Sequence, residues 1–325
     1  MNFVAVRAHA GSRLNLDAQE GQIPDNARLI VALCERGSTL TAPVGVLALT
    51  CPIAGSVDVM SGEWSVRLGK RDISVGDAQT RHDVVVSPRG GCIVIAGTPI
   101  AWSALGGKGT PGLQPASMLF PAVHRSVPAF ARRLLQFTRH CLKQGHGPGS
   151  THLAHQLACV LDDLQAGFAA MISRCPGSSL SRKKAVFLRL QRVRNHISAC
   201  AHEELDVAKL ALMANYSVGH FITTFRLVFH ETPYSNVSRY RLESASTLLS
   251  RSTLGIADIA HAIGFQSRSS FTRAIRKHLG SSATQFRESA GSFPHALAAE
   301  HGNHESLAGV VPRFARSPWF ANEPK

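Results

Sequence analysis

The stretch "IADIAHAIGFQSRSSFTRAIRKHLG", residues 256–280, decides the fold of the carboxy-terminal part of the chain. Its first half carries apolar residues at helical spacing, and its second half places Phe271 and Ile275 on one face of a helix. Gly264 separates the halves. The other face of the second half is polar and consists of Arg268, Ser269, Thr272 and Arg273. The pattern predicts two helices joined by a short turn.

A second copy of this pattern lies upstream. Residues 205–226, "LDVAKLALMANYSVGHFITTFR", align with residues 254–276 at an offset of 49 residues before the turn and 50 after it. Each copy has small residues where helices must approach, a residue that tolerates a left-handed turn, and two apolar anchors. These positions are Ala208, Ala211, Asn215, Phe221 and Phe225 in the first copy, and Ala257, Ala260, Gly264, Phe271 and Ile275 in the second. Each copy is therefore predicted to be a helix-turn-helix.

The segment between the copies, "NVSRYRLESASTLLS" (236–250), is apolar at the spacing of a connecting helix. Its fifteen residues give a helix of roughly 22 Å. With the packing offset of each unit added, the two polar faces are expected about one turn of B-DNA apart, on one side of the duplex.

The charge of the chain favours a polyanionic partner. Lys and Arg number 35 against 21 Asp and Glu, which gives a net charge of +14 and a pI near 10.1. Residues 176–290 contain 16 Lys or Arg and 7 Asp or Glu, so this segment alone carries +9. Double-stranded DNA is the expected partner, and an anionic membrane surface is the second candidate.

Several classes of protein are disfavoured. The seven cysteines are scattered, odd in number and without a C-x-x-C pair, which argues against a disulfide framework or a zinc ribbon. No cofactor or metal is expected, because the β-rich region offers only His82. The amino terminus lacks the apolar core of a signal peptide, and no apolar stretch is long enough to span a membrane. We expect a cytoplasmic protein, associated with the nucleoid when bound, with reduced and mostly buried thiols.

The chain is expected to be an α+β protein. Residues 27–104 show short β-branched runs, typical of an antiparallel sandwich or small barrel, with a hairpin at 61–77. Residues 117–172 are predicted to form a helical hairpin that completes a first domain, 1–175. A linker at 176–184, an all-helical domain at 185–289 and a flexible tail at 290–325 follow.

The segment from about 190 to 287 resembles the DNA-binding domain of the AraC/XylS family of bacterial transcriptional regulators. The resemblance covers about 100 residues and rests on "RVRNHI", "LALMANYSVGHFITTFRLVF", "TPYSNVSRYRLESASTLL" and "IADIAHAIGFQSRSSFTRAIRKHLGSSATQFR". It implies two helix-turn-helix units joined by a long helix, which agrees with the repeat. The chain departs from the family pattern at Ile275, His230 and Ala283, where Phe, Gly and Pro are usual. We expect His230 to end a helix in place of glycine.

The polar faces of the two copies supply the candidate base-contacting residues. Arginine can bond guanine bidentately, and hydroxyl groups can donate or accept. In the second copy these residues are Arg268, Ser269, Thr272 and Arg273. The first copy offers Val218, Gly219, Ile222 and Thr223 and is poor in donors. His220 and Thr224 flank this face and are expected to be able to reach a base or the backbone. Arg226, Arg239, Arg276 and Lys277 are expected to contact phosphates instead.

The resemblance also implies an amino-terminal domain that senses a small molecule or mediates dimerisation, often with a cupin-like barrel. Trp64 and Trp102 could line its ligand pocket, although core packing is the simpler role. A regulator of this kind, expected to be an activator, would have RNA polymerase as a partner and a homodimer as its assembly. Two alternatives remain: an architectural DNA binder without sequence preference, and a DNA-repair methyl acceptor, although "SRCPGS" around Cys175 lacks the His and Arg which that chemistry needs.

Overall fold

The computed structural model describes residues 2–16, 28–62, 64–104, 119–125, 128–145 and 147–289. The predicted tail, 290–325, lies outside the described residues. The chain divides into two compact units after Arg192, inside one long helix. The described part confirms the predicted α+β class, with a β-rich amino-terminal unit and a helical carboxy-terminal unit.

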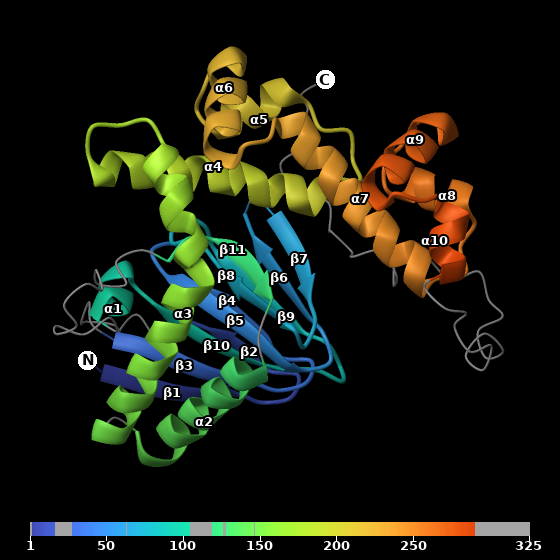
Figure 1. Cartoon of the computed structure of the whole chain (residues 1–325). Coiled ribbons are helices and arrows are strands. Elements are labelled where there is room, and N and C mark those ends of the chain that lie inside the picture. The colour runs from blue at the N-terminus through green and yellow to red at the C-terminus, as the bar shows by residue number, and fades with distance from the viewer. Residues whose placement is uncertain are drawn as a thin grey trace, which may run out of the picture. The chain divides into compact units, whose positions relative to one another are not determined.

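The described part of the amino-terminal unit contains two sheets (Figure 1). The six-stranded sheet has the order β1 (Asn2–Ala8), β3 (Arg28–Cys34), β10 (Gly91–Gly97), β5 (Leu47–Ala54), β8 (Asp72–Val75) and β11 (Ala122–Arg125). The five-stranded sheet has the order β2 (Arg13–Asn15), β4 (Thr39–Ala42), β9 (His82–Val86), β6 (Val57–Ser61) and β7 (Trp64–Leu68).

The central strands of the larger sheet are buried on both faces, because alternate side chains belong to two different cores. On β10, Cys92, Val94 and Ala96 belong to an apolar core shared with the five-stranded sheet. Ile93 and Ile95 belong to a second core, shared with helices α2 and α3. Strand β10 is therefore a continuous apolar run without a polar face.

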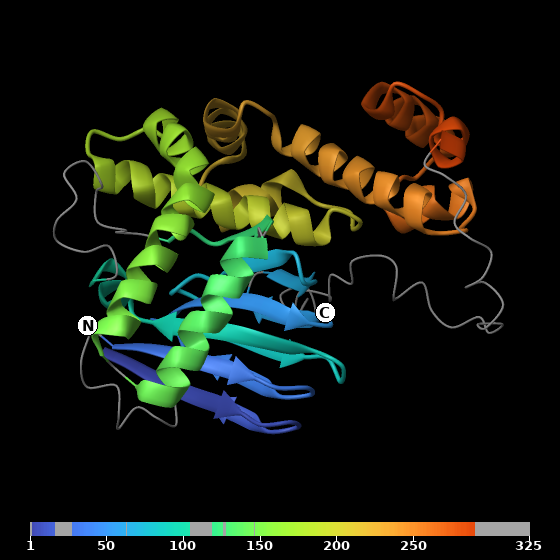
Figure 2. The ribbon, with the colours of Figure 1, turned by 60° about the horizontal axis from the view of Figure 1, so that its bottom comes forward.

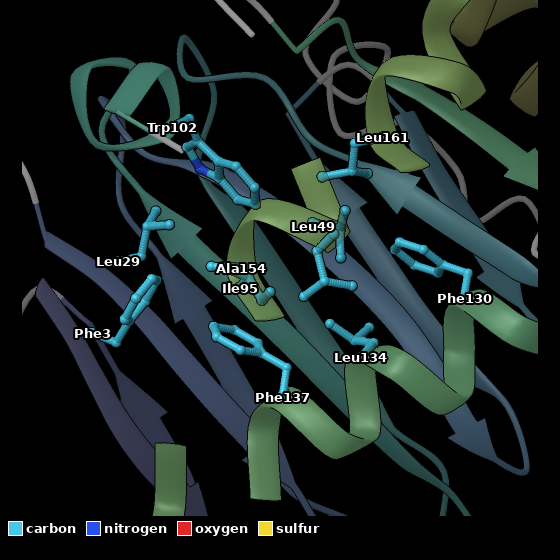
Figure 3. Close-up of a pocket in the computed structure, with 11 residues that line it drawn as sticks. Phe3, Leu29, Leu49, Ile95, Trp102, Phe130, Leu134, Phe137, Ala154 and Leu161 are labelled. Carbon is cyan, nitrogen blue, oxygen red and sulfur yellow. The ribbon is translucent and has the colours of Figure 1, made fainter. Parts of the chain in front are cut away.

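Helices cover the outer face of the larger sheet. They are α1 (Pro99–Ser103), α2 (Pro128–Gln144) and α3 (Pro148–Arg174), and Figure 2 shows α2 and α3 lying across the strands. Between sheet and helices lies a small hollow lined by apolar side chains, among them Phe3, Leu49 and Phe137 (Figure 3). Trp102 lines this hollow, is 3% exposed and donates its indole N–H to the carbonyl oxygen of Leu47 at 3.1 Å.

Two strands, β1 and β2, lie outside the predicted β region, 27–104, and both pair in parallel with their neighbours. β1 pairs with β3 and β2 pairs with β4 in parallel. The cause is a corner that occurs twice: the turn between β1 and β2 lies against the turn between β3 and β4. Three backbone bonds join these turns, including Gly11 N–H to the oxygen of Arg36 at 3.1 Å. The two strands that flank one turn, β1 and β2, therefore run alongside the two strands that flank the other, β3 and β4.

The predicted hairpin at 61–77 is wrong in its pairing. The turn at Gly69 forms, with the amide of Gly69 donating to Asp72 at 2.8 Å. However, β7 pairs with β6, and β8 belongs to the other sheet. Ile73 and Val75 of β8 are buried in the core beneath the helices, so the chain crosses between the sheets at this corner.

Two other boundaries differ from the prediction. Residues 119–125 are not helical as expected for 117–172, because Ala122–Arg125 pairs with β8 as strand β11. Helix α4 (Leu180–Cys200) takes in the last five residues of the predicted linker 176–184. Its first half packs in the amino-terminal unit, where Phe187 contacts Phe120 with ring centroids 4.9 Å apart and Arg192 pairs with Asp77.

The carboxy-terminal unit continues from α4 with six helices in its described part (Figure 1). They are α5 (Val207–Met213), α6 (Val218–Phe229), α7 (Pro233–Arg251), α8 (Ile256–Ala262), α9 (Arg268–Leu279) and α10 (Ala283–Ser289). α5 and α6 pack at the amino-terminal end of α7, and α8, α9 and α10 pack at its other end. The predicted order of two helix-turn-helix units around one connecting helix is confirmed.

One prediction concerns the pH dependence of stability. His82 is 1% exposed and donates from Nε2 to the carbonyl oxygen of Asp77 at 2.6 Å, and burial lowers its pKa below the ordinary value near 6.5. The unfolded chain therefore binds a proton near pH 6.5 that the native unit resists, and the free energy of unfolding should fall as the pH drops below this value. His82→Gln should flatten that dependence between pH 7 and pH 5.

The measurement is urea unfolding followed by tryptophan fluorescence, which reports outside the helical unit because residues 185–289 contain no tryptophan. His9→Gln is the control, because the His9 side chain is 74% exposed. Equal slopes for His82→Gln and the wild type would contradict the assignment.

A second prediction uses the internal repeat as its own control. His230 and Gly280 end α6 and α9 with left-handed backbone, at φ 59° and φ 73°. A residue with a Cβ atom in this conformation costs about 1 kcal/mol relative to glycine. His230→Gly should therefore raise the free energy of unfolding by about 0.5–1 kcal/mol. Gly280→Ala should lower it by a similar amount, since nothing lies within 4 Å of the added Cβ. Chemical denaturation followed by far-UV circular dichroism measures both; shifts of the same sign would be inconsistent with this account.

Candidate nucleic-acid interface

Two buried anchors on each second helix determine which side chains face outward. Phe221 and Phe225 of α6 are 0% exposed, and so are Phe271 and Ile275 of α9. The anchors on one helix are four residues apart, so they occupy one face and leave the opposite face free. The predicted anchor positions are confirmed, and Ile275 fills its core position although the family pattern has Phe there.

The turns between the paired helices adopt the predicted conformation. Asn215 has φ 57° and Gly264 has φ 87°, both in the left-handed region. The small residues inside the first helices were only half correctly placed. Ala211 and Ala260 are buried, whereas Ala208 and Ala257, three residues earlier in each helix, are exposed to solvent. A seven-residue helix turns only one narrow stripe toward its neighbour, and these two positions lie outside it.

All four candidate base-contacting residues of α9 lie at exposed positions: Arg268, Ser269, Thr272 and Arg273. Ser267 caps the helix, with Oγ accepting from the amide of Ser270 at 3.2 Å. The Thr272 hydroxyl donates to the carbonyl oxygen of Arg268 at 2.8 Å, which leaves its oxygen as an acceptor and its methyl group exposed. Neither arginine takes part in an ion pair among the described residues. Both guanidinium groups are therefore available to a ligand.

The corresponding face of α6 is mostly apolar. Its exposed members are Val218 (42% exposed), Gly219, His220, Ile222 (36% exposed) and Thr223. The His220 ring packs on Tyr216 with centroids 4.5 Å apart, and the Thr223 hydroxyl donates to the carbonyl oxygen of Gly219 at 2.9 Å. Thr224 is 3% exposed, so the expectation that it could reach DNA was wrong. It lies on the same side of the helix as the anchors Phe221 and Phe225.

Three of the four candidate phosphate contacts are exposed, namely Arg226, Arg276 and Lys277. The fourth, Arg239, differs because it is held by two carboxylates. Its Nη2 lies 3.2 Å from Glu231 and its Nη1 lies 2.7 Å from Glu243. Its guanidinium also stands 4.4 Å from the centre of the Tyr240 ring. These contacts fix the first turns of α7 and neutralise most of the charge that Arg239 could present to a phosphate.

One residue of this unit was not singled out from the sequence. Arg241, in the middle of α7, donates to the carbonyl oxygens of Ala201 and Glu203, forty and thirty-eight residues away. A contact between such distant segments leaves no local pattern in the sequence. The sequence shows only an arginine within a predicted helix, and this is equally compatible with an ordinary solvent-exposed charge.

Neither a metal site nor a reactive Cys175 thiol is evident in the described part of the chain. Within it, no group of three His, Cys, Asp or Glu side chains could hold a metal ion. Six of the seven cysteines are buried and Cys159 is exposed. Burial raises the pKa of Cys175 to about 11, so this thiol remains protonated at neutral pH and is a poor methyl acceptor. In the same part, no helix has the length and apolar character needed to cross a bilayer.

Comparison with known proteins shows what the helical unit is similar to. A family model described as "Helix-turn-helix domain" matches residues 210–289. The probable transcriptional regulator LumQ of Photobacterium leiognathi is 30% identical over 105 residues, 32% of this chain and 42% of LumQ. The RCS-specific HTH-type transcriptional activator RclR of Escherichia coli K12 is 35% identical over 82 residues, 25% of this chain and 29% of RclR.

The chain thus spans less than half the length of either relative. Among solved structures, the DNA-binding domain of AdpA in complex with a target DNA is 29% identical; the match covers 31% of this chain and 91% of that one, with a TM-score of 0.30. The family model matches residues 210–289, which contain both anchored helices, α6 and α9. The chain therefore carries, in its carboxy-terminal part, the tandem helix-turn-helix domain of the AraC/XylS family.

Proposed function

We propose that this protein is a sequence-specific transcriptional regulator that binds double-stranded DNA through α6 and α9. In this proposal residues 185–289 bind DNA, and residues 1 to about 175 sense a ligand or mediate dimerisation. The observation that carries the proposal is the pair of anchored helices, each with one face buried and the other exposed. An exposed helix face of this kind fits the major groove, which admits one α-helix.

The second recognition helix, α9, supplies most of the hydrogen bonding to bases. Arg268 and Arg273 each offer a planar fork of donors that matches the O6 and N7 atoms of guanine. Ser269 can donate or accept, and Thr272 can accept a hydrogen bond or place its methyl group against thymine. A good bidentate contact discriminates between bases by about 1–3 kcal/mol, so these two arginines account for most of the base preference.

The first recognition helix, α6, discriminates between base pairs by shape and apolar contact. Val218 and Ile222 expose methyl groups that suit thymine methyls, and Gly219 lets the backbone approach the groove closely. His220 and Thr223 are its polar members. This helix therefore favours A·T-rich sequence with little hydrogen bonding, while Arg226, Arg276 and Lys277 hold the backbone of the duplex.

In the competing proposal the protein is an architectural DNA binder without sequence preference. The exposed arginines on the face of α9 argue against it, because non-specific affinity needs only phosphate contacts. The two functions differ in one measurement. A regulator should lose about 10³-fold or more in affinity when its preferred site is scrambled, whereas an architectural binder should lose almost nothing.

The regulatory role includes several finer proposals. We propose that the protein activates transcription in the cytoplasm, in contact with RNA polymerase and as a homodimer; one of its relatives is named an activator. A promoter fused to a reporter gene, with and without candidate ligands, distinguishes activation from repression.

Arg273→Ala tests the base-contacting role. Removing a bidentate contact should abolish discrimination at one base pair, with a loss of about tenfold or more for the preferred base and little change for the others. Affinities for duplexes that carry all four base pairs at each position of the site provide the measurement. A uniform loss across all variants would contradict a base contact.

Arg276→Ala is the matched comparison on the same helix. Arg276 is exposed and lies outside the base-contacting set, so its loss should weaken binding to every duplex by a similar factor. The slope of log affinity against log salt should also become shallower by about 1. An unchanged salt dependence would remove Arg276 from the phosphate contacts.

A further inference from the structure

The proposed function requires two recognition helices at a definite separation, and α7 alone does not secure it. Helix α7 has 19 residues, which is about 28 Å along its axis. A helix of this length sets a distance, but each unit could still tilt about its end of the rod. The orientation of the two units therefore depends on contacts beside α7.

Arg241 provides such a contact to the first helix-turn-helix unit, α5 and α6. Its Nε donates to the carbonyl oxygen of Ala201 at 2.6 Å, and its Nη2 donates to that of Glu203 at 2.8 Å. Both carbonyls belong to the segment between α4 and α5, where the first helix-turn-helix begins. The guanidinium is half-buried, and its two bonds use the rigid fork that arginine alone among the side chains possesses.

The same guanidinium faces the second unit. It lies 5.9 Å from the centre of the Phe265 ring, in the turn between α8 and α9. Phe265 packs edge-on against Phe271, the anchor of the second recognition helix, with centroids 5.5 Å apart. One side chain thus connects the entry of the first helix-turn-helix to the aromatic pair that fixes the second.

The backbone closes around this contact. A Cβ atom at Gly264 would lie 2.4 Å from the carbonyl oxygen of His202 and 3.1 Å from Nη2 of Arg241. The turn of the second unit therefore lies directly against the segment that opens the first unit, at a distance that only glycine permits. Segment 201–203, Arg241 and the turn at Gly264 form one junction, which we call the inter-unit junction.

We propose that Arg241 is a positioning residue that holds the two recognition helices in one relative placement, so that the protein accepts its operator at only one spacing between the two contacted segments. The inference rests on the proposed function. Arg241 would make no contribution to base preference within either contacted DNA segment. Its donors bond the carbonyl oxygens of Ala201 and Glu203 inside the protein and do not face DNA. Its effect would appear only when both segments are bound together.

The experiment uses the full chain and a duplex selected from random DNA by the wild-type protein. Protection of guanine N7 locates the major-groove segment contacted by α9, and interference by uracil in place of thymine locates the segment contacted by α6. Derivatives with one base pair inserted or removed between the segments change the separation by about 3.4 Å and the rotation by about 35°. The wild type should lose at least about tenfold in affinity for either derivative, since its first helix is then misplaced.

Arg241→Met keeps much of the side-chain length but has no donors, and Arg241→Lys keeps the charge but lacks the fork. Both should bind the two altered duplexes within about threefold of the selected one. A duplex that contains only the segment bound by α9 should be bound as tightly as by the wild type. Arg251→Met is the control: Arg251 is exposed near the end of the same helix, and its loss should leave the spacing penalty unchanged.

Three results would overturn the proposal. The first is a wild-type spacing penalty retained in Arg241→Met. The second is the absence of any penalty in the wild type. The third is weaker binding of Arg241→Met to the single-segment duplex, which would make Arg241 a structural residue of one unit. A different failure, in which the wild type prefers no sequence over scrambled DNA, would instead refute the proposed function itself.

Discussion

The burial of two anchors on each recognition helix is the constraint on which the interface depends. A helix with two residues fixed one turn apart has no freedom to rotate, so its exposed face follows from its buried one. Phe221 and Phe225 thereby decide that Val218 and Ile222 face outward, and the anchors of α9 decide the same for its arginines. The orientation of the exposed face therefore follows from the packing of the core. A change in an anchor residue would alter both the core and the exposed face.

The repeat made the carboxy-terminal unit predictable and left most of the amino-terminal unit beyond reach. Helices, turns and anchors recur at a fixed offset, so each copy supports the interpretation of the other, down to the left-handed backbone at Asn215 and Gly264. The sheets offered no such check. Whether β8 continues the hairpin of β7 or joins the other sheet depends on partners distant in the chain, and β11 has only four residues.

The exposure of the candidate base-contacting residues on α9 was predictable for the same reason. Exposure of the α9 residues follows from helical periodicity, which is local. The pairing of Arg239 with Glu231 and Glu243 is also nearly local, yet a basic residue on a helix does not reveal whether its charge is already engaged. The role of Arg241 could not be predicted from the sequence. Its partners lie between α4 and α5, and the first helix-turn-helix separates them from α7 along the chain.

In the proposed function, the unequal chemistry of the two recognition helices gives their spacing its importance. A helix that offers methyl groups and few donors gains little by binding alone. Joined rigidly to a helix that is already bound, it meets its segment at a high effective concentration, and even weak contacts then add to affinity and selectivity. That benefit exists only while the separation matches the groove. The apolar face of α6 is therefore useful to the extent that the inter-unit junction is rigid, which makes Arg241 more important to the first recognition helix than to the second.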